Sequence, residues 1–281
     1  MLLITGANGQ LGQSLQHLLA PEKYIATDIE QLDITNENAV FDFVNQYPLS
    51  AIINCAAYTN VDRSEEEPSA AIRINVLGPA HLAKAAAFKH IPLVHISTDY
   101  VFDGKHHLPL KETDPVRPLG VYGQTKLDGE QNVLKYAETA VILRTAWMHS
   151  PYGENFVKNV LRRSKITSEL HMVADQFGTP TYAPFLAQTI LEILPRIAYR
   201  SCETYHLTNE GTATWYDFAY YILQLVHSPC KVLPIHTAEN PARALRPSFG
   251  VLDKTKFKNM FDITIPHWTQ GVKACVEALT R

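Results

Sequence analysis

The chain opens on Leu2-Leu3-Ile4-Thr5-Gly6-Ala7-Asn8-Gly9-Gln10-Leu11-Gly12, an apolar run followed by a glycine-rich loop. The run is short and continuous, which is typical of a parallel strand buried on both faces. Leucines then recur at helical spacing, at Leu11, Leu15, Leu18 and Leu19. Glycines let a backbone turn tightly against a pyrophosphate, and the helix start offers free N–H groups. We therefore interpret the loop as a dinucleotide site; the alternative is a tight structural turn.

Further apolar runs alternate with helical patterns through the first half of the chain. The expected strands are Tyr24 to Asp28, Ala51 to Ala57, Leu93 to Thr98 and Ala140 to Thr145. The expected helices carry Ala39 to Val44, span Ser69 to Phe88, and begin at Tyr122. This alternation predicts an α/β fold with a Rossmann-type, doubly wound parallel sheet. Cys55 and His95 are expected in its core, whereas Asn75 has two open roles: contact with a cofactor loop, or helix capping at the surface.

From Trp147 onward the composition shifts toward Pro, Tyr and His. We expect a smaller mixed α/β substrate lobe from residues 146–179 and 205–281, beside a dinucleotide-binding domain of residues 1–145. Residues 180–204, which include a helix from Ala183 to Leu194, should pack back on that domain. Within the lobe we expect a helix in Gly153 to Ser164, strands at Leu170 to Val173 and Tyr205 to Leu207, and an edge strand at Lys231 to Ile235. Thr214 should cap a further helix, whose aromatic stripe begins at Trp215. We assign this stripe to the core; the alternative is a platform for a sugar.

Composition narrows the class of protein. The 281 residues carry a net charge of −3, which gives no reason to expect nucleic acid or an anionic membrane as a partner. The four cysteines are scattered, with no CxxC or metal-like spacing, so we predict no metal site from them. No stretch approaches the ~20 apolar residues of a membrane span, and no signal-peptide pattern opens the chain. We expect a cytoplasmic protein.

Tyr122 and Lys126 lie four residues apart at the start of an expected helix and should share one face. A neighbouring ammonium group favours phenolate, so we expect Lys126 to lower the pKa of Tyr122 and make it a usable acid or base. Taken alone, the pair could be an ordinary surface pair.

Thr98 ends an expected strand, and ligands bind at the carboxyl ends of strands in such sheets. Asp28, 22 positions after Gly6, matches a ribose ligand of NAD or merely caps its strand.

Three segments together carry a resemblance: TGANGQLG at residues 5–12, Ser97-Thr98-Asp99-Tyr100-Val101-Phe102, and Tyr122-Gly123-Gln124-Thr125-Lys126. They resemble the extended short-chain dehydrogenase/reductases and, more narrowly, the dTDP-4-dehydrorhamnose reductases, a likeness that DQFGTPT at 175–181 and Arg246-Pro247 extend to the whole chain. The resemblance implies NAD(P)H-dependent reduction of the C4 ketone of dTDP-4-dehydro-β-L-rhamnose to dTDP-β-L-rhamnose, the last step of dTDP-L-rhamnose synthesis. It implies NADP(H) as the preferred cofactor with NAD(H) possible, possible Mg²⁺ without an assigned site, and a monomer or homodimer.

The resemblance also assigns roles to residues. It implies a catalytic set of Thr98, Tyr122 and Lys126. Implied cofactor ligands are Gly6, Gly9, Gln10, Leu11, Gly12, Asp28, Asp33, Ile34, Ala56, Ala57 and Tyr58, with Tyr122 and Lys126. Implied substrate ligands are Val61, Thr98, Asp99, Tyr100, Trp147 and Arg246. Arg246 suits a diphosphate because arginine binds phosphates in bidentate fashion; Arg243 is a second candidate, with a structural role as the alternative.

Departures from the family pattern lie in the second half, at Gly250, Met148-His149 and Ala183-Pro184-Phe185, and they concern substrate recognition more than chemistry. Two other functions stay open. One is a nucleotide-sugar epimerase or dehydratase with retained NAD. The other is a non-catalytic, cofactor-binding regulatory subunit, against which the intact Thr98, Tyr122 and Lys126 argue.

Overall fold

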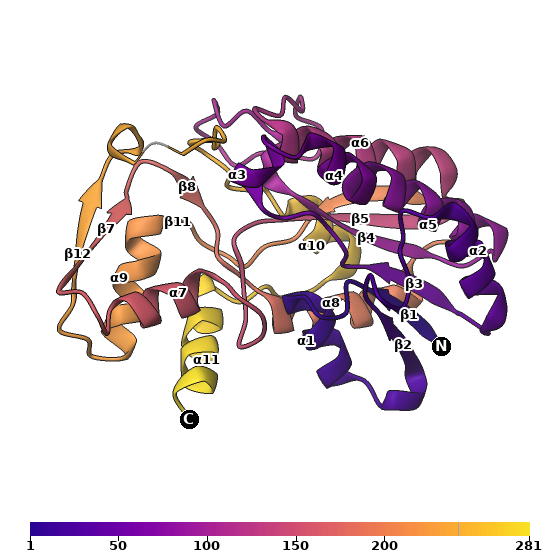
Figure 1. Ribbon diagram of the computed structural model, residues 1–281, viewed down its shortest axis with the longest axis horizontal. Helices are drawn as coiled ribbons and strands as arrows, with labels where there is room; N and C mark the ends of the chain where they lie inside the picture. Colours follow the sequence, from indigo (N-terminus) through magenta and orange to yellow (C-terminus); the bar gives the residue numbers. More distant parts are fainter. Residues whose placement is uncertain (241) are drawn as a thin grey trace.

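A computed structural model describes residues 1–240 and 242–281 (Figure 1). Its centre is a six-stranded, all-parallel sheet in the order β10-β5-β4-β3-β1-β2. The strands are β1 (Leu2–Thr5), β2 (Tyr24–Thr27), β3 (Ala51–Asn54), β4 (Leu93–Thr98), β5 (Ala140–Thr145) and β10 (Cys202–His206). The chain order reverses between β1 and β3, the switch point where α/β sheets bind ligands. The predicted doubly wound parallel sheet is confirmed.

Helices cover both faces of the sheet (Figure 1). One face is covered by α1 (Gln10–Leu18), α8 (Ala183–Ile193) and α10 (Thr255–Phe261); the other by α2 (Glu37–Gln46), α5 (Gly78–Phe88) and α6 (Val121–Tyr136). Each face has its own apolar core, with Leu15 and Ile190 in the first and Val40 and Leu82 in the second. Burial of such side chains stabilises the fold by roughly 1.5–3 kcal/mol each. The helix formed by residues 183–193 packs back on the sheet, as its sequence predicts.

The second lobe, at the left of Figure 1, has a separate core around Phe218 and Ile222. Its elements are α7 (Phe156–Arg163), α9 (Trp215–Leu225), α11 (Trp268–Thr280), β6 (Met148–His149), β7 (Glu169–Val173), β8 (Phe177–Gly178), β9 (Thr181–Tyr182), β11 (Ala213–Thr214) and β12 (Lys231–Ile235). Thr214 caps α9 in a capping box with Asp217, as expected. Among the described residues, β12 pairs in parallel with β7 alone, which confirms the prediction of an edge strand.

The expected start of this lobe at residue 205 is wrong by a few residues. Tyr205 and His206 belong to β10, which pairs with β5 at the edge of the central sheet. Helix α10 also packs against β10, since Phe257 lies edge-on to Tyr205 with ring centroids 6.0 Å apart. The C-terminal third therefore contributes to both lobes.

The single helix expected from Ser69 to Phe88 contains a π-helical turn, Arg73–Leu77, between α4 (Pro68–Ile72) and α5. Asn75 sits on that turn and is buried. Its Oδ1 accepts the Tyr58 backbone N–H at 2.8 Å, and its Nδ2 donates to the Tyr58 carbonyl at 3.1 Å. Of the two roles left open for Asn75, the structure supports the loop contact: it fixes the segment that follows β3. Within the described residues, no helix has the length and apolarity needed to cross a membrane.

Candidate active site

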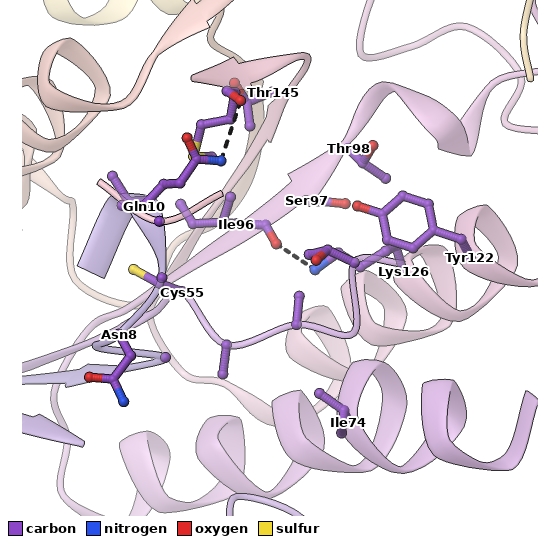
Figure 2. Close-up of a pocket in the computed structure, with 18 of the residues that line it drawn as sticks. Asn8, Gln10, Cys55, Ile74, Ile96, Ser97, Thr98, Tyr122, Lys126 and Thr145 are labelled. Atoms are coloured by element: carbon purple, nitrogen blue, oxygen red, sulfur yellow. Dashed lines mark hydrogen bonds between the residues drawn. The ribbon is translucent and has the colours of Figure 1, made fainter. Parts of the chain in front are cut away.

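A cavity of about 770 Å³ lies at the carboxyl ends of the central strands, where the two lobes meet. The glycine loop, the segment after β3, the end of β4 and the start of α6 form its walls, and Trp147 and Trp215 reach it from the second lobe. Its volume is in the range of known ligand and cofactor sites. Figure 2 shows that side chains far apart in the sequence, from Asn8 to Thr145, face this space.

The glycine loop has the backbone geometry that a dinucleotide requires. Gly6 adopts a φ of +68°, which favours glycine, and a Cβ there would lie 2.5 Å from the Ala56 nitrogen. A Cβ on Gly12 would overlap the Gly6 carbonyl, so the loop can pack this closely on α1 only because Gly12 has no side chain. Gly9 is the N-cap of α1 and supplies no side-chain acceptor, so the first N–H groups of α1 stay available. Gly6, Gly9, Gln10 and Leu11 line the cavity, and this cradle fits a pyrophosphate.

Asp28, Asp33 and Ile34 line the opposite end of the cradle. The Asp28 carboxylate accepts backbone N–H groups from Asn8 at 3.0 Å and Ile29 at 2.9 Å. Of the described residues that line this end, none is a lysine or an arginine. The surroundings therefore accept a ribose hydroxyl readily and offer no cation to a 2′-phosphate.

The segment after β3 forms another wall. Ala56 and Ala57 line the cavity with small side chains, whereas the Tyr58 hydroxyl turns away and donates to Glu67 at 2.9 Å. Tyr58 thus contributes through its backbone, which Asn75 holds. Cys55 was expected in the core; it packs against that core as a half-buried residue just after β3, and it also lines the cavity (Figure 2).

Thr98, Tyr122 and Lys126 line one side of the same cavity (Figure 2). Thr98 ends β4, while Tyr122 and Lys126 occupy the first turns of α6. Thr98 Oγ1 donates to Asp99 Oδ1 at 3.1 Å, and Tyr100 packs edge-on against Tyr122 with ring centroids 5.4 Å apart. Since the phenol, the ammonium group and the hydroxyl face one space, they can act on one bound carbonyl.

The expected effect of Lys126 on Tyr122 is not what the structure shows. Burial raises the pKa of Tyr122 to about 12, opposed by a hydrogen bond from Thr98. Burial also lowers the pKa of Lys126 to about 8, and its Nζ donates to the Ile96 carbonyl at 2.6 Å. The prediction was wrong because it ignored the loss of solvent, which is the largest cause of the shift, and because Lys126 is not among the groups that act on the Tyr122 pKa. Tyr122 is therefore protonated throughout the physiological range, as a proton donor must be.

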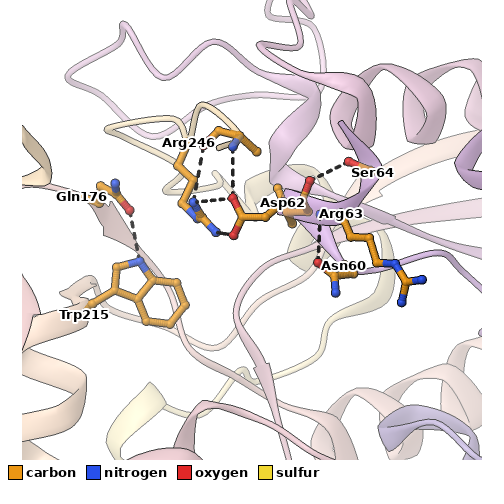
Figure 3. Close-up of polar contacts among 9 residues, drawn as sticks. Asn60, Asp62, Arg63, Ser64, Gln176, Trp215 and Arg246 are labelled. Atoms are coloured by element: carbon orange, nitrogen blue, oxygen red, sulfur yellow. Dashed lines mark hydrogen bonds and ion pairs between the residues drawn. The ribbon is translucent and has the colours of Figure 1, made fainter. Parts of the chain in front are cut away.

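The expected substrate residues divide into two groups. Val61, Asp99, Tyr100 and Trp147 line the cavity. Arg246 lies outside the lining: its Nη2 donates to Asp62 Oδ2 at 2.8 Å (Figure 3). The exposed Arg243 pairs with Glu66. Burial raises the pKa of Asp99 to about 7. The structure thus gathers at the cavity four of the residues expected near the sugar, and it shows the two arginines in ion pairs.

Trp215 is a site residue that the sequence pattern missed. Its helix-spaced aromatic stripe predicts a core role, which holds for Phe218, but Trp215 lines the cavity. Its ring stacks on Trp147 with centroids 3.7 Å apart, and its Nε1 donates to Gln176 Oε1 at 3.2 Å (Figure 3). The Trp147 ring occupies the space that a Cβ on Gly178 would fill. The two indoles form a fixed apolar platform.

Comparison with known proteins agrees with this geometry. The family model described as the RmlD substrate binding domain matches residues 1–281. A dTDP-4-dehydrorhamnose reductase from Aggregatibacter actinomycetemcomitans is 41% identical over 284 residues, covering 97% of each chain. This chain belongs to the dTDP-4-dehydrorhamnose reductase family.

Solved structures of the same family share the whole fold. A dTDP-4-dehydrorhamnose reductase from Clostridium acetobutylicum is 41% identical, with a TM-score of 0.95 over 100% of this chain and 99% of that one. Another from Bacillus anthracis, solved in complex with NADP, is 38% identical, with a TM-score of 0.93 over 98% of this chain and 97% of that one. The family resemblance inferred from the three sequence segments is confirmed.

In residues 1–240 and 242–281 of this family member, no group of three or more His, Cys, Asp and Glu side chains could hold a metal ion.

Replacing Trp215 by leucine tests the indole platform. We expect the KM for the nucleotide sugar to rise about tenfold, because a stacked aromatic contact and a buried apolar face are lost. The dissociation constant of NADPH, measured by fluorescence titration, should change by less than about twofold. Trp215→Phe keeps the ring but removes the Nε1 donor to Gln176, and should give a smaller rise. Equal effects of Trp215→Leu on both ligands would contradict a platform specific to the sugar side.

Proposed function

We propose that this protein reduces the C4 ketone of dTDP-4-dehydro-β-L-rhamnose to dTDP-β-L-rhamnose, the last step of dTDP-L-rhamnose synthesis, with NADPH as hydride donor. The observation that carries the proposal is the convergence of Thr98, Tyr122 and Lys126 on the cavity that also holds the glycine cradle. The family supports the substrate, since the relatives in the comparison are named for it. Purified protein should oxidise NADPH only when the 4-keto sugar nucleotide is added; no oxidation under those conditions would exclude the reaction.

The roles of the three side chains follow from their chemistry. NADPH, when bound in the glycine cradle, supplies the hydride. Tyr122 donates its phenolic proton to the ketone oxygen as negative charge develops there. The Thr98 hydroxyl turns from Asp99 to donate a hydrogen bond to the same oxygen, which stabilises that charge. Lys126 is anchored on the Ile96 carbonyl. From there it would hold the ribose hydroxyls of the bound cofactor and supply a positive charge on the side of the phenol.

The cofactor preference can be tested at Asp28. We propose that the enzyme uses NADPH, because the relative from Bacillus anthracis was solved in complex with NADP, and that it also accepts NADH because Asp28 suits a free ribose. Asp28→Asn removes a negative charge near the expected 2′-phosphate. The ratio of kcat/KM for NADPH to that for NADH should then rise about tenfold, equivalent to about 1.4 kcal/mol. An unchanged ratio would mean that Asp28 does not face the 2′ position.

A pH profile tests the state of Lys126. Since burial lowers its pKa to about 8, the ammonium form is complete below that value and disappears as pH rises through it. Tyr122, with a pKa of about 12, stays protonated throughout. The kcat/KM for NADPH reports groups of the free enzyme, so loss of the Lys126 charge should lower it through an alkaline limb near pH 8. A constant kcat/KM up to pH 10 would show that the charge of Lys126 is not needed.

The epimerase or dehydratase alternative makes a different prediction about the cofactor. Such an enzyme regenerates its NAD in each cycle, so NAD would remain bound after purification and would not be consumed. We favour the reductase because the family is named for it. We also propose that the enzyme acts in the cytoplasm as a monomer or homodimer, which sedimentation with and without Mg²⁺ would distinguish.

A further inference from the structure

Glu130 extends the catalytic face of α6 by one turn. Tyr122, Lys126 and Glu130 are spaced by four residues, so they form one stripe along the helix. The stripe faces the sheet, and Glu130 is only 2% exposed. A buried carboxylate is costly unless it is paired, so its partners and its purpose need an explanation.

The partners of Glu130 come from the two strands that end at the site. Arg144 of β5 donates to it twice, from Nε at 2.9 Å and from Nη2 at 2.7 Å, and Ser97 of β4 donates from its hydroxyl. Ser97 and Arg144 are direct neighbours in the β4–β5 register. Glu130 therefore fixes α6 against β4 one residue before Thr98. The bidentate geometry also resists rotation of the helix.

Glu130 is also the nearby anion that opposes the desolvation of Lys126. Four titratable groups act on Lys126 or face it: Cys55 after β3, His95 on β4, and Tyr122 and Glu130 on α6. Two more charged or titratable groups contact the Tyr122–Lys126–Glu130 stripe, namely Arg144 on β5 and Asp99 after β4. Burial raises the pKa of Cys55 to about 12 and holds that of His95 well below its usual value, so both are neutral near pH 7. Among the causes acting on Lys126, Glu130 is the largest that favours the ammonium form.

We propose that Glu130, pinned by Arg144 and Ser97, is a positioning residue that keeps Lys126 in its ammonium form and aligns Tyr122 and Lys126 with Thr98. This role rests on the proposed reduction, because Lys126 and Tyr122 act there on the cofactor and the ketone. Glu130 itself touches neither. Figure 2 shows the part of the arrangement that faces the cavity, with Lys126 bonded to the Ile96 carbonyl beside Ser97.

The test is the pH dependence of Glu130→Gln. Loss of the carboxylate should move the alkaline limb of kcat/KM for NADPH downward by about one pH unit, the size expected for removal of a close opposite charge. The NADPH dissociation constant, followed by fluorescence across the same pH range, should show the same displacement without any turnover. Glu130→Asp, which keeps the charge, should restore the limb to its position in the unmodified protein.

Glu130→Gln leaves Arg144 buried without its partner, which destabilises the fold. The double variant Glu130→Met with Arg144→Met avoids this. Buried ion pairs can be replaced by apolar residues of similar length without loss of the fold. A downward shift in the double variant supports the proposal. If the alkaline limb of kcat/KM stays at its original pH in both variants, while activity falls by the same factor at every pH, the proposal is overturned. Absence of turnover in the unmodified protein would instead contradict the proposed function, and the NADPH titration would still decide the role of Glu130.

Discussion

Tyr122→Phe should lower kcat by about a thousandfold, within the ~10²–10⁴ range attributed to a positioned proton donor. This corresponds to about 4 kcal/mol of transition-state stabilisation. The substitution removes one hydroxyl and keeps the ring, so the edge-on contact with Tyr100 survives. Stopped-flow and steady-state assays with NADPH and the 4-keto sugar nucleotide measure the effect. Because the loss concerns chemistry alone, the dissociation constants of NADPH and of the sugar nucleotide should stay within about twofold.

Tyr136→Phe is the matched control, since Tyr136 lies on the same helix but at its far end and outside the cavity. It should leave kcat unchanged. Retention of more than a tenth of kcat by Tyr122→Phe would mean that another group, or water, delivers the proton. Retained binding with lost activity would also separate catalysis from cofactor binding, and would count against a purely regulatory subunit.

The sequence predicts the parts of this site that depend on local pattern. Buried parallel strands read as continuous apolar runs, and Leu93 to Thr98 is confirmed as β4 with its polar end at the cavity. Glycines at Gly6 and Gly12 have a direct backbone reason. Tyr122 and Lys126 share a face because helical spacing requires it. For the strand and for the Tyr122–Lys126 pair the information is local in the sequence, whereas the close approach at Gly6 also involves Ala56.

The parts that the sequence misses depend on pairing or burial. The second lobe was expected to begin at residue 205, within β10, because nothing near Tyr205 reveals that its strand pairs with Ala140 to Arg144. Arg246 was expected at a diphosphate, but its partner in the structure is Asp62, 184 positions away (Figure 3). The sign of the Tyr122 pKa shift was wrong because desolvation depends on packing around the helix. The place of Trp215 in the cavity wall was not predicted, because helical periodicity identifies the apolar face of a helix but does not show which end of that face meets a cavity.

Gly6→Ala should raise the dissociation constant of NADPH by about a hundredfold, or about 2.7 kcal/mol. An alanine at a φ of +68° costs roughly 1–2 kcal/mol, and its Cβ would lie 2.5–2.7 Å from the Cys55–Ala56 backbone. The backbone at Ala56 must then move, yet it forms the wall on which the cofactor lies. Overpacking of this kind adds roughly 1–3 kcal/mol, so the free energy of unfolding should fall by about 2–5 kcal/mol. Fluorescence titration and urea denaturation measure the two effects.

Gly9→Ala is the control within the same loop. Gly9 has a φ of −74°, which any residue adopts, and a Cβ there would meet only the Gly6 carbonyl, at 3.2 Å. It should lower the free energy of unfolding by less than about 1 kcal/mol. If Gly6→Ala and Gly9→Ala weaken NADPH binding equally, the effect is loss of space for the phosphates, and the Gly6–Ala56 approach is not the cause. If only Gly6→Ala does, the close approach of two backbone segments, set by a positive φ, builds the cradle.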